Sequence, residues 1–244
     1  MSELESGVLS VVVPMYNEAA TLEQVLELVL KQSLVGEVIL VDDGSSDGTV
    51  DLAAALAQKE TRVRLYQHQR NQGKGAALRT GFAAATRPYV IVQDADMEYD
   101  PADYVKVIGP LLRGEAEVVY GSRYLKRDTR RVLRFWHTMG NRFLTTWSNM
   151  ASDLYVTDME TCYKGFRREV IQAIPIEEDR FGFEPEVTAK LAKMDLRVME
   201  TSISYFPRSY DEGKKIGVRD GFRAMWCILK YNVFEQTVVV WKDA

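Results

Sequence analysis

The first 125 residues alternate between short apolar runs and amphipathic stretches. Apolar runs predict four strands, over Val8–Val13, Glu37–Val41, Val63–Tyr66 and Tyr89–Val92. The intervening stretches predict helices, most clearly from Glu18 to Lys31, where the apolar side chains recur at helical spacing at Leu22, Val25, Leu26, Val29 and Leu30. Two more helices are expected, one ending near Ala57 and one over Ala76–Ala85. This alternation predicts an α/β fold with a doubly wound, mainly parallel sheet flanked by helices.

Polar clusters follow three of the predicted strands directly. They are Pro14-Met15-Tyr16-Asn17-Glu18, Asp42-Asp43-Gly44-Ser45-Ser46-Asp47-Gly48 and Gln93-Asp94-Ala95-Asp96. Ligands of doubly wound sheets bind outside the carboxyl ends of the strands. A binding site is therefore expected where these clusters meet.

The second half of the chain has a different pattern. Val118–Tyr120 and Arg197–Tyr205 predict strands, Val187–Ala192 predicts a helix, and Val218–Phe234 predicts a long amphipathic helix. Between residues 123 and 147 the chain is basic and aromatic. This stretch contains one acid, Asp128, against Arg123, Lys126, Arg127, Arg130, Arg131, Arg134 and Arg142, with Phe135, Trp136, Phe143, Leu144 and Trp147 interleaved.

The composition of the chain excludes several classes of function. The 244 residues suit one large α/β domain, and a net charge of −4 argues against a nucleic-acid binder, which usually carries a basic excess. The two cysteines, Cys162 and Cys227, form no CxxC motif and are interpreted as reduced cytosolic thiols. The chain has no uncharged apolar run long enough to span a bilayer, so lipid would have to be met from the membrane surface.

Asp94-Ala95-Asp96 carries the strongest chemical signal. The two carboxylates follow a buried strand, and Glu98 lies two residues further on. Oxygen ligands suit a hard cation such as Mg²⁺ or Mn²⁺, which binds a diphosphate and neutralises the charge that grows on a leaving group. We therefore predict that Asp94 and Asp96 hold a divalent metal, with Asp96 catalytic.

The two polar clusters nearer the N-terminus are typical of a nucleotide site. Tyr16 suits stacking on a base, and Asp42 or Asp43 suits hydrogen bonds from base or ribose. Turn formation and helix capping account for Gly44, Gly48 and Asp47. The loop Asn71-Gln72-Gly73-Lys74-Gly75 allows close approach of a backbone and offers the cation of Lys74 to the same site.

PMYNEAATL, VDDGSSDGT, NQGKGAAL and QDAD, in this order and spacing, resemble the family 2 glycosyltransferases with the Rossmann-like GT-A fold. The resemblance covers roughly Leu9 to Arg123. It implies an inverting transferase that uses a UDP- or GDP-sugar and a divalent metal. It also places Pro14, Tyr16, Glu18, Asp42 and Asp43 around the nucleotide and makes Asp94 and Asp96 the metal pair.

The second half resembles, more loosely, dolichyl-phosphate mannose synthases and bacterial polyprenyl-phosphate glycosyltransferases. The matching segments are Gly121-Ser122-Arg123, Gly140–Leu144, Tyr163–Val170 and Arg208–Lys214. The resemblance implies that Glu98 takes a third metal position and that phosphates of acceptor or donor meet Arg123, Arg134, Arg208 and Lys214. The expected organisation is a nucleotide-sugar half over 1–125, an acceptor-binding half over 126–217 and a C-terminal helical segment over 218–244.

Acceptor chemistry supports the same interpretation. A phosphate monoester has a second pKa of about 6 and is already a nucleophile at neutral pH, so its transfer needs cations rather than a general base. Arginines suit bidentate phosphate contacts, and interleaved aromatics suit an interface. We therefore expect a polyprenyl phosphate acceptor and peripheral attachment to the cytoplasmic face of a membrane, either directly or through a membrane-protein partner.

One alternative acceptor remains open, and two other classes of protein are disfavoured. A sugar or small-molecule hydroxyl as acceptor would need a base, for which Asp158 or Glu160 is suited, and Glu184 and Glu186 are further acidic candidates. These acids also suit pairing with nearby arginines. A sugar-nucleotide pyrophosphorylase would need a Gly-rich basic loop after the first strand, which Pro14–Glu18 is not. A non-catalytic binding module is disfavoured by the intact Asp94 and Asp96 pair.

Overall fold

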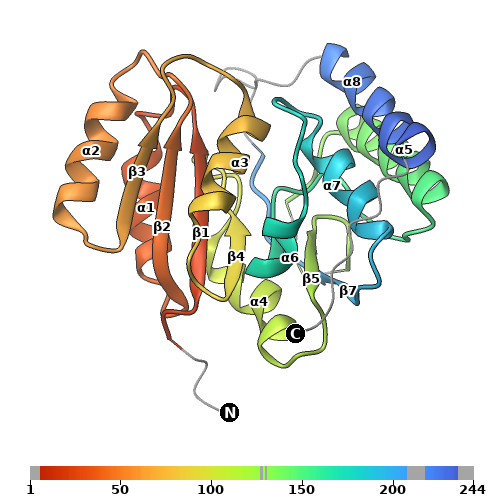
Figure 1. Ribbon diagram of the computed structural model, residues 1–244, viewed down its shortest axis with the longest axis horizontal. Coiled ribbons are helices and arrows are strands. Elements are labelled where there is room, and N and C mark those ends of the chain that lie inside the picture. The colour runs from red at the N-terminus through yellow and green to blue at the C-terminus, as the bar shows by residue number, and fades with distance from the viewer. Residues whose placement is uncertain (1–5, 127–128, 130, 208–217, 236–244) are drawn as a thin grey trace.

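The computed structural model of the chain describes residues 6–126, 129, 131–207 and 218–235. One seven-stranded sheet forms its centre, with the strand order β3-β2-β1-β4-β6-β5-β7 (Figure 1). The strands are β1 Leu9–Met15, β2 Val35–Asp42, β3 Val63–Gln67, β4 Tyr89–Val92, β5 Val118–Ser122, β6 Lys164–Arg167 and β7 Val198–Ser202.

The sheet is mainly parallel, as the sequence predicts. β1 pairs in parallel with β2 and β4, and β2 pairs in parallel with β3. β6 is the exception, because it runs antiparallel to both β4 and β5 and separates them. β7 closes the edge in parallel with β5. Strands from residues 126–217 thus complete the same sheet that residues 1–125 begin.

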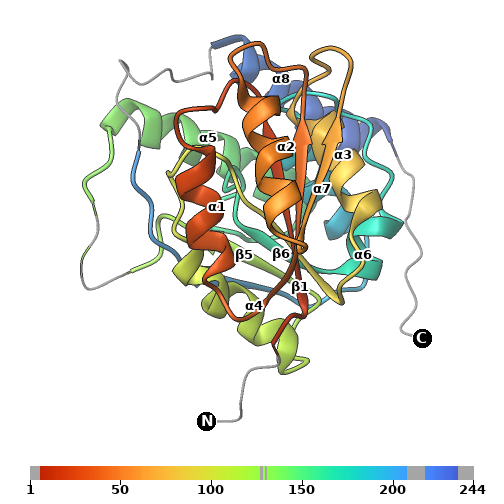
Figure 2. The same cartoon turned by 90° about the vertical axis from the view of Figure 1, so that its left-hand side faces the viewer.

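Helices cover both faces of the sheet. α3 packs on β1 and β2 and contacts α6, whereas α4 packs on β5, β6 and β7 on the opposite face, together with α1 (Figures 1 and 2). The bounds of these elements are α1 Leu22–Leu30, α2 Thr49–Lys59, α3 Lys74–Ala84, the 3₁₀ turn η1 Pro101–Asp103, α4 Tyr104–Leu112 and α6 Arg168–Ala173. The apolar side of α1 is buried at the predicted positions Leu22, Val25, Leu26 and Val29.

A helical layer lies beyond the carboxyl ends of the strands. It consists of α5 Phe135–Ser152, α7 Phe183–Ala192, α8 Val218–Leu229 and the π-helical turn η3 Lys230–Phe234, which contact one another. α7 begins four residues before the predicted Val187, and the predicted helix over 218–234 changes to π-helical geometry at Lys230. Among the described residues, no helix is both long and apolar enough to cross a bilayer.

Candidate active site

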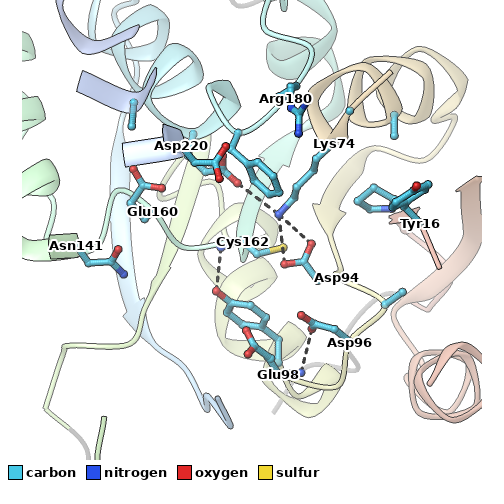
Figure 3. Close-up of a pocket in the computed structure, with 18 of the residues that line it drawn as sticks. Tyr16, Lys74, Asp94, Asp96, Glu98, Asn141, Glu160, Cys162, Arg180 and Asp220 are labelled. Atoms are coloured by element: carbon cyan, nitrogen blue, oxygen red, sulfur yellow. Dashed lines mark hydrogen bonds and ion pairs between the residues drawn. The ribbon is translucent and has the colours of Figure 1, made fainter. Parts of the chain in front are cut away.

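A cleft of about 850 Å³ lies at the carboxyl ends of the central strands. Figure 3 shows its two sides, with Tyr16 on one, Asn141 and Glu160 on the other, and Lys74 and Asp94 between them. The residues that line it are Pro14, Met15, Tyr16, Glu18, Asp43, Asn71, Gly73, Lys74, Ala77, Asp94, Ala95, Asp96, Glu98, Tyr99, Arg123, His137, Gly140, Asn141, Leu144, Glu160, Cys162, Arg180, Phe181, Glu184, Tyr205, Asp220, Gly221 and Ala224. The three predicted polar clusters therefore meet as expected.

The loops after β1 and β2 are joined by hydrogen bonds. The backbone N–H of Asn17 donates to Ser45 Oγ, and the Asn17 side-chain oxygen accepts from the N–H of Ser46. Asn17 has a left-handed backbone (φ 55°), which asparagine tolerates better than most residues. Tyr16, the residue just before it, is exposed and lines the cleft.

Asp42 and Asp43 have different surroundings. Asp42 is fully buried; its Oδ2 accepts from the N–H groups of Gly44 and Ser45, and its Oδ1 has no partner among the described residues. Asp43 lines the cleft, and its carboxylate accepts from the N–H groups of Gln72 and Gly73 and contacts His68 Nδ1 at 2.8 Å. Asp43 thus holds the Gly-rich loop against the end of β2.

The Gly-rich loop is shaped by a close backbone contact within the protein. A Cβ on Gly73 would lie 2.3 Å from the carbonyl oxygen of Asp179, and one on Gly75 would lie 2.0 Å from that of Glu178. The backbone that approaches this loop is therefore the segment just before α7. The contact brings Lys74 next to Glu184 at the first turn of α7.

Lys74 is the cation at the centre of the cleft. Its Nζ lies 2.9 Å from Asp94 Oδ1 and 3.4 Å from Glu184 Oε1. Burial opposes the ammonium charge, but Asp94 and Glu184 raise the pKa of Lys74 well above its usual value. Lys74 therefore stays protonated and offers positive charge to an anionic ligand.

The Asp94–Glu98 loop presents three carboxylates to the cleft, those of Asp94, Asp96 and Glu98. Asp96 Oδ1 accepts from the N–H of Glu98, and Met97 between them has a left-handed backbone (φ 62°), a strained conformation for this residue. Glu98 lies in the same cleft, where its Oε2 accepts from the Tyr205 hydroxyl. The described residues gather no cluster of three acidic, histidine or cysteine ligands. The donor set fits a hard cation that takes one or two carboxylates from the protein and the rest of its oxygens from a diphosphate and water.

Arg123 and Asp158 form a buried ion pair at the end of β5. Arg123 Nε and one terminal nitrogen each lie 2.7 Å from a different Asp158 oxygen, and the Arg123 backbone N–H donates to Oδ2 at 3.0 Å. The guanidinium also lies over the Tyr205 ring, 5.0 Å from its centroid. Asp158 is fully buried and both its oxygens are engaged, so its role is to orient Arg123 in the cleft.

Glu160 has no such partner. Its Oε1 is buried and accepts no hydrogen bond within the described part of the chain. Burial, followed by the nearby charge of Glu184, raises the pKa of Glu160 to about 7. Glu186 is different, because both its oxygens accept from the backbone of residues 177–178 and it pairs with Lys190 at 2.7 Å. Glu186 is thus a structural acid.

The remaining predicted residues lie apart from this cleft or outside the described residues. Arg134 is the exposed N-cap of α5 and is not among the lining residues. Arg208 and Lys214 lie outside the described residues. Asn141, within the matching segment Gly140–Leu144, and Cys162, expected only as a reduced thiol, also line the cleft. Four further lining residues were not predicted at all, namely His137, Arg180, Phe181 and Asp220. No motif marks them, since only packing of α5, α7 and α8 brings them to the strand ends.

The chain belongs to glycosyl transferase family 2, whose family model matches residues 10–174, more than half of its length. It is 29% identical over 224 residues to the undecaprenyl-phosphate 4-deoxy-4-formamido-L-arabinose transferase of Aeromonas hydrophila subsp. hydrophila, covering 88% of this chain and 64% of that protein. It is 27% identical over 217 residues to the undecaprenyl-phosphate mannosyltransferase of Micrococcus luteus, covering 84% of this chain and 86% of that protein.

The fold is also similar to a solved structure. Glucosyl-3-phosphoglycerate synthase from Mycobacterium tuberculosis, in complex with Mn²⁺, UDP and phosphoglyceric acid, superposes with a TM-score of 0.71 at 22% identity, covering 93% of this chain and 78% of that one. At this identity the likeness concerns the GT-A fold alone. The predicted fold class is confirmed.

Proposed function

We propose that this glycosyltransferase moves one sugar from a UDP- or GDP-sugar to a polyprenyl phosphate, with inversion at the anomeric carbon. The proposal rests on which elements form the two sides of the cleft. One side is formed by the β1, β2 and β4 loops, which suit a nucleotide diphosphate, and the other side is formed by α5 and α8. The similarity to two transferases named for undecaprenyl phosphate supports this acceptor.

Outer faces of α5 and α8 support an acceptor that resides in a membrane. Along α5 an apolar stripe is exposed at Trp136, Met139, Phe143 and Met150, with Trp136 83% exposed. Along α8 and η3 a second stripe is exposed at Phe222, Trp226, Val233 and Phe234. Large exposed apolar patches mark interaction surfaces, and the basic side chains of Arg131, Arg134 and Arg142 nearby favour anionic lipid. We propose peripheral attachment through these faces at the cytoplasmic side of a membrane.

The reaction needs no general base. An oxygen of the acceptor phosphate attacks the anomeric carbon, the bond from that carbon to the nucleoside diphosphate breaks, and the diphosphate leaves with the electron pair. Lys74 and Arg123 supply positive charge to the phosphates, and Asp158 keeps Arg123 oriented. A divalent cation held by Asp94 and Asp96 would neutralise the leaving diphosphate.

A product assay tests the proposal. The wild-type protein is incubated with UDP- and GDP-sugars, Mn²⁺ and either undecaprenyl phosphate or soluble sugar acceptors, and the products are separated by mass. The expected product is a lipid-linked sugar phosphate with the anomeric configuration opposite to that of the donor. Transfer to soluble hydroxyls with no transfer to lipid phosphate would overturn the proposal.

Glu160 favours one second candidate, transfer to a hydroxyl. Its buried Oε1 without a partner and a pKa near 7 would suit a general base. Asp158, the other acid that the sequence suggests for this role, is held by Arg123 at both oxygens. Within this second candidate, Glu160 is therefore the base.

A further inference from the structure

Glu160 lines the cleft, and the base-free reaction assigns it no role. It lies on the side of the cleft formed by α5 and α8, across from Tyr16 (Figure 3). Buried carboxyl oxygens normally accept hydrogen bonds, because an unpaired one loses the solvation it has in water. Glu160 as a whole is half-buried and lines the cleft, so its carboxyl group, whose Oε1 has no partner among the described residues, borders the space that a ligand would fill.

Cations near Glu160 are engaged elsewhere. Lys164 Nζ donates to the carbonyl oxygens of Met159, at 2.9 Å, and Thr161, and its own pKa is lowered by burial. Arg123 is paired with Asp158. Both cations lower the pKa of Glu160 from a distance, yet burial and the acid Glu184 outweigh them.

Other charged groups belong to the helices around the same cleft. Glu184 is on α7 and contacts Lys74 at 3.4 Å, while His137 of α5 and Asp220 of α8 line the cleft. Within the described residues, Glu160 forms no ion pair with a lysine, arginine or histidine. An ionised Glu160 would thus add a negative charge where the acceptor is expected to bind.

We propose that Glu160 acts as a neutral carboxylic acid that donates a hydrogen bond to the acceptor phosphate, and that it thereby selects an anionic acceptor. This inference rests on the proposed function. A phosphate monoester dianion offers only acceptor oxygens, so a carboxylate would repel it and a carboxylic acid would bind it. The proton stays on Glu160 throughout, because the nucleophile needs none removed.

The two roles of Glu160 predict opposite pH dependences. As a hydrogen-bond donor, Glu160 must be protonated, so kcat/KM falls as the pH rises through about 7. The acceptor phosphate must lose its second proton near about pH 6, which adds an acid limb and gives a narrow bell. As a general base, Glu160 must be ionised, so kcat/KM for a hydroxyl acceptor would rise through the same pH.

The test compares Glu160→Gln with wild type on a short-chain polyprenyl phosphate, using the nucleotide sugar that the wild type turns over. Gln keeps the shape and the donor of the protonated acid but does not titrate. We expect the variant to retain kcat/KM at pH 6.5 within about fivefold, and to lose the alkaline limb, which in the wild type falls about tenfold per pH unit. Glu27→Gln, which removes an exposed carboxylate on α1, serves as the matched control and should keep the wild-type bell.

Outcomes separate the inference from the proposed function. Loss of turnover on lipid phosphate in Glu160→Gln by more than about 100-fold, with thermal stabilisation by UDP and Mn²⁺ unchanged, would overturn the donor role alone. Persistence of the alkaline limb in the variant would do the same. A wild type that glycosylates only hydroxyl acceptors, with a rising pH profile that Glu160→Gln abolishes, would overturn the proposed function as well.

Discussion

Replacing Asp158 by alanine is expected to destabilise the protein strongly by leaving Arg123 buried without its counterion. The Arg123 and Asp158 side chains are only 6% and 0% exposed, and they are joined by two bonds of 2.7 Å. Removing one partner of a buried ion pair typically costs about 3–5 kcal/mol, because the remaining charge stays desolvated. For a protein of this size, that corresponds to a fall in Tm of roughly 6–20 °C.

A double-mutant cycle isolates the pair. Urea denaturation of Asp158→Ala, Arg123→Met and the double variant Arg123→Met/Asp158→Ala gives the free energy of unfolding of each. The double variant should cost less than the two single variants together, because apolar groups replace both charges. Additive costs would refute the reasoning.

Asp179→Ala is the matched control. Asp179 pairs with Arg79 at the same 2.7 Å, but the two side chains are 58% and 43% exposed. Solvent screens such a pair, so its loss should cost about 0–1 kcal/mol. If Asp158→Ala also lowers the free energy of unfolding by less than about 1 kcal/mol, Arg123 does not require Asp158 as a counterion in its buried position. Loss of activity at Asp158 would then no longer be attributable to a misplaced Arg123.

Four further predictions concern the cleft and its surroundings. Asp96→Asn should remove most turnover without lowering Tm, and wild-type turnover should stop in excess EDTA; full activity in EDTA would rule out the metal role of Asp94 and Asp96. Arg134 is exposed outside the cleft, so Arg134→Ala should lower turnover of polyprenyl phosphate presented in anionic vesicles, by weakening the lipid contact, while leaving the affinity for UDP or GDP, measured by calorimetry, unchanged. Trp136→Ser/Trp226→Ser should weaken salt-sensitive flotation with anionic liposomes, and equal flotation of variant and wild type would place the lipid contact elsewhere. The pKa of Glu160 is raised from 4.5 to about 7 in the folded protein, so its contribution to the free energy of unfolding is full below pH 4.5 and is lost as the pH rises through 7. Between pH 4.5 and 8, the free energy of unfolding of Glu160→Gln, measured by urea denaturation, should therefore rise by about 3 kcal/mol relative to that of the wild type.

The sequence by itself determined the parallel core and the edge at which the site lies. Strands buried on both faces are continuous apolar runs, which is why β4 matches its prediction, Tyr89–Val92, at both ends. The polar clusters that follow β1, β2 and β4 meet because parallel strands end at one edge of a sheet. The loops around Tyr16, Asp43, Lys74, Asp94 and Asp96 could therefore be assigned to one cleft before any coordinates.

Tertiary structure alone decided which elements complete the sheet and which acids remain chemically available. β6 has four residues, Lys164–Arg167, with a buried lysine at its start, so it has no apolar run to mark it; it is a strand because β4 and β5 bond it on both sides. α4 was not predicted either, since Pro110 interrupts its pattern.

The acidic residues near the cleft show most clearly what the sequence alone does not predict. The sequence offers no means of telling Asp158, Glu160 and Glu186 apart. In the structure, Asp158 is held by Arg123, and Glu186 is held by Lys190 and the backbone of residues 177–178. Glu160 keeps a buried oxygen that has no partner in the described part of the chain. The Arg123–Asp158 pair joins residues 35 positions apart. Burial and the charges brought in by distant segments set the protonation state of each acid, and the order of residues along the chain does not encode them locally.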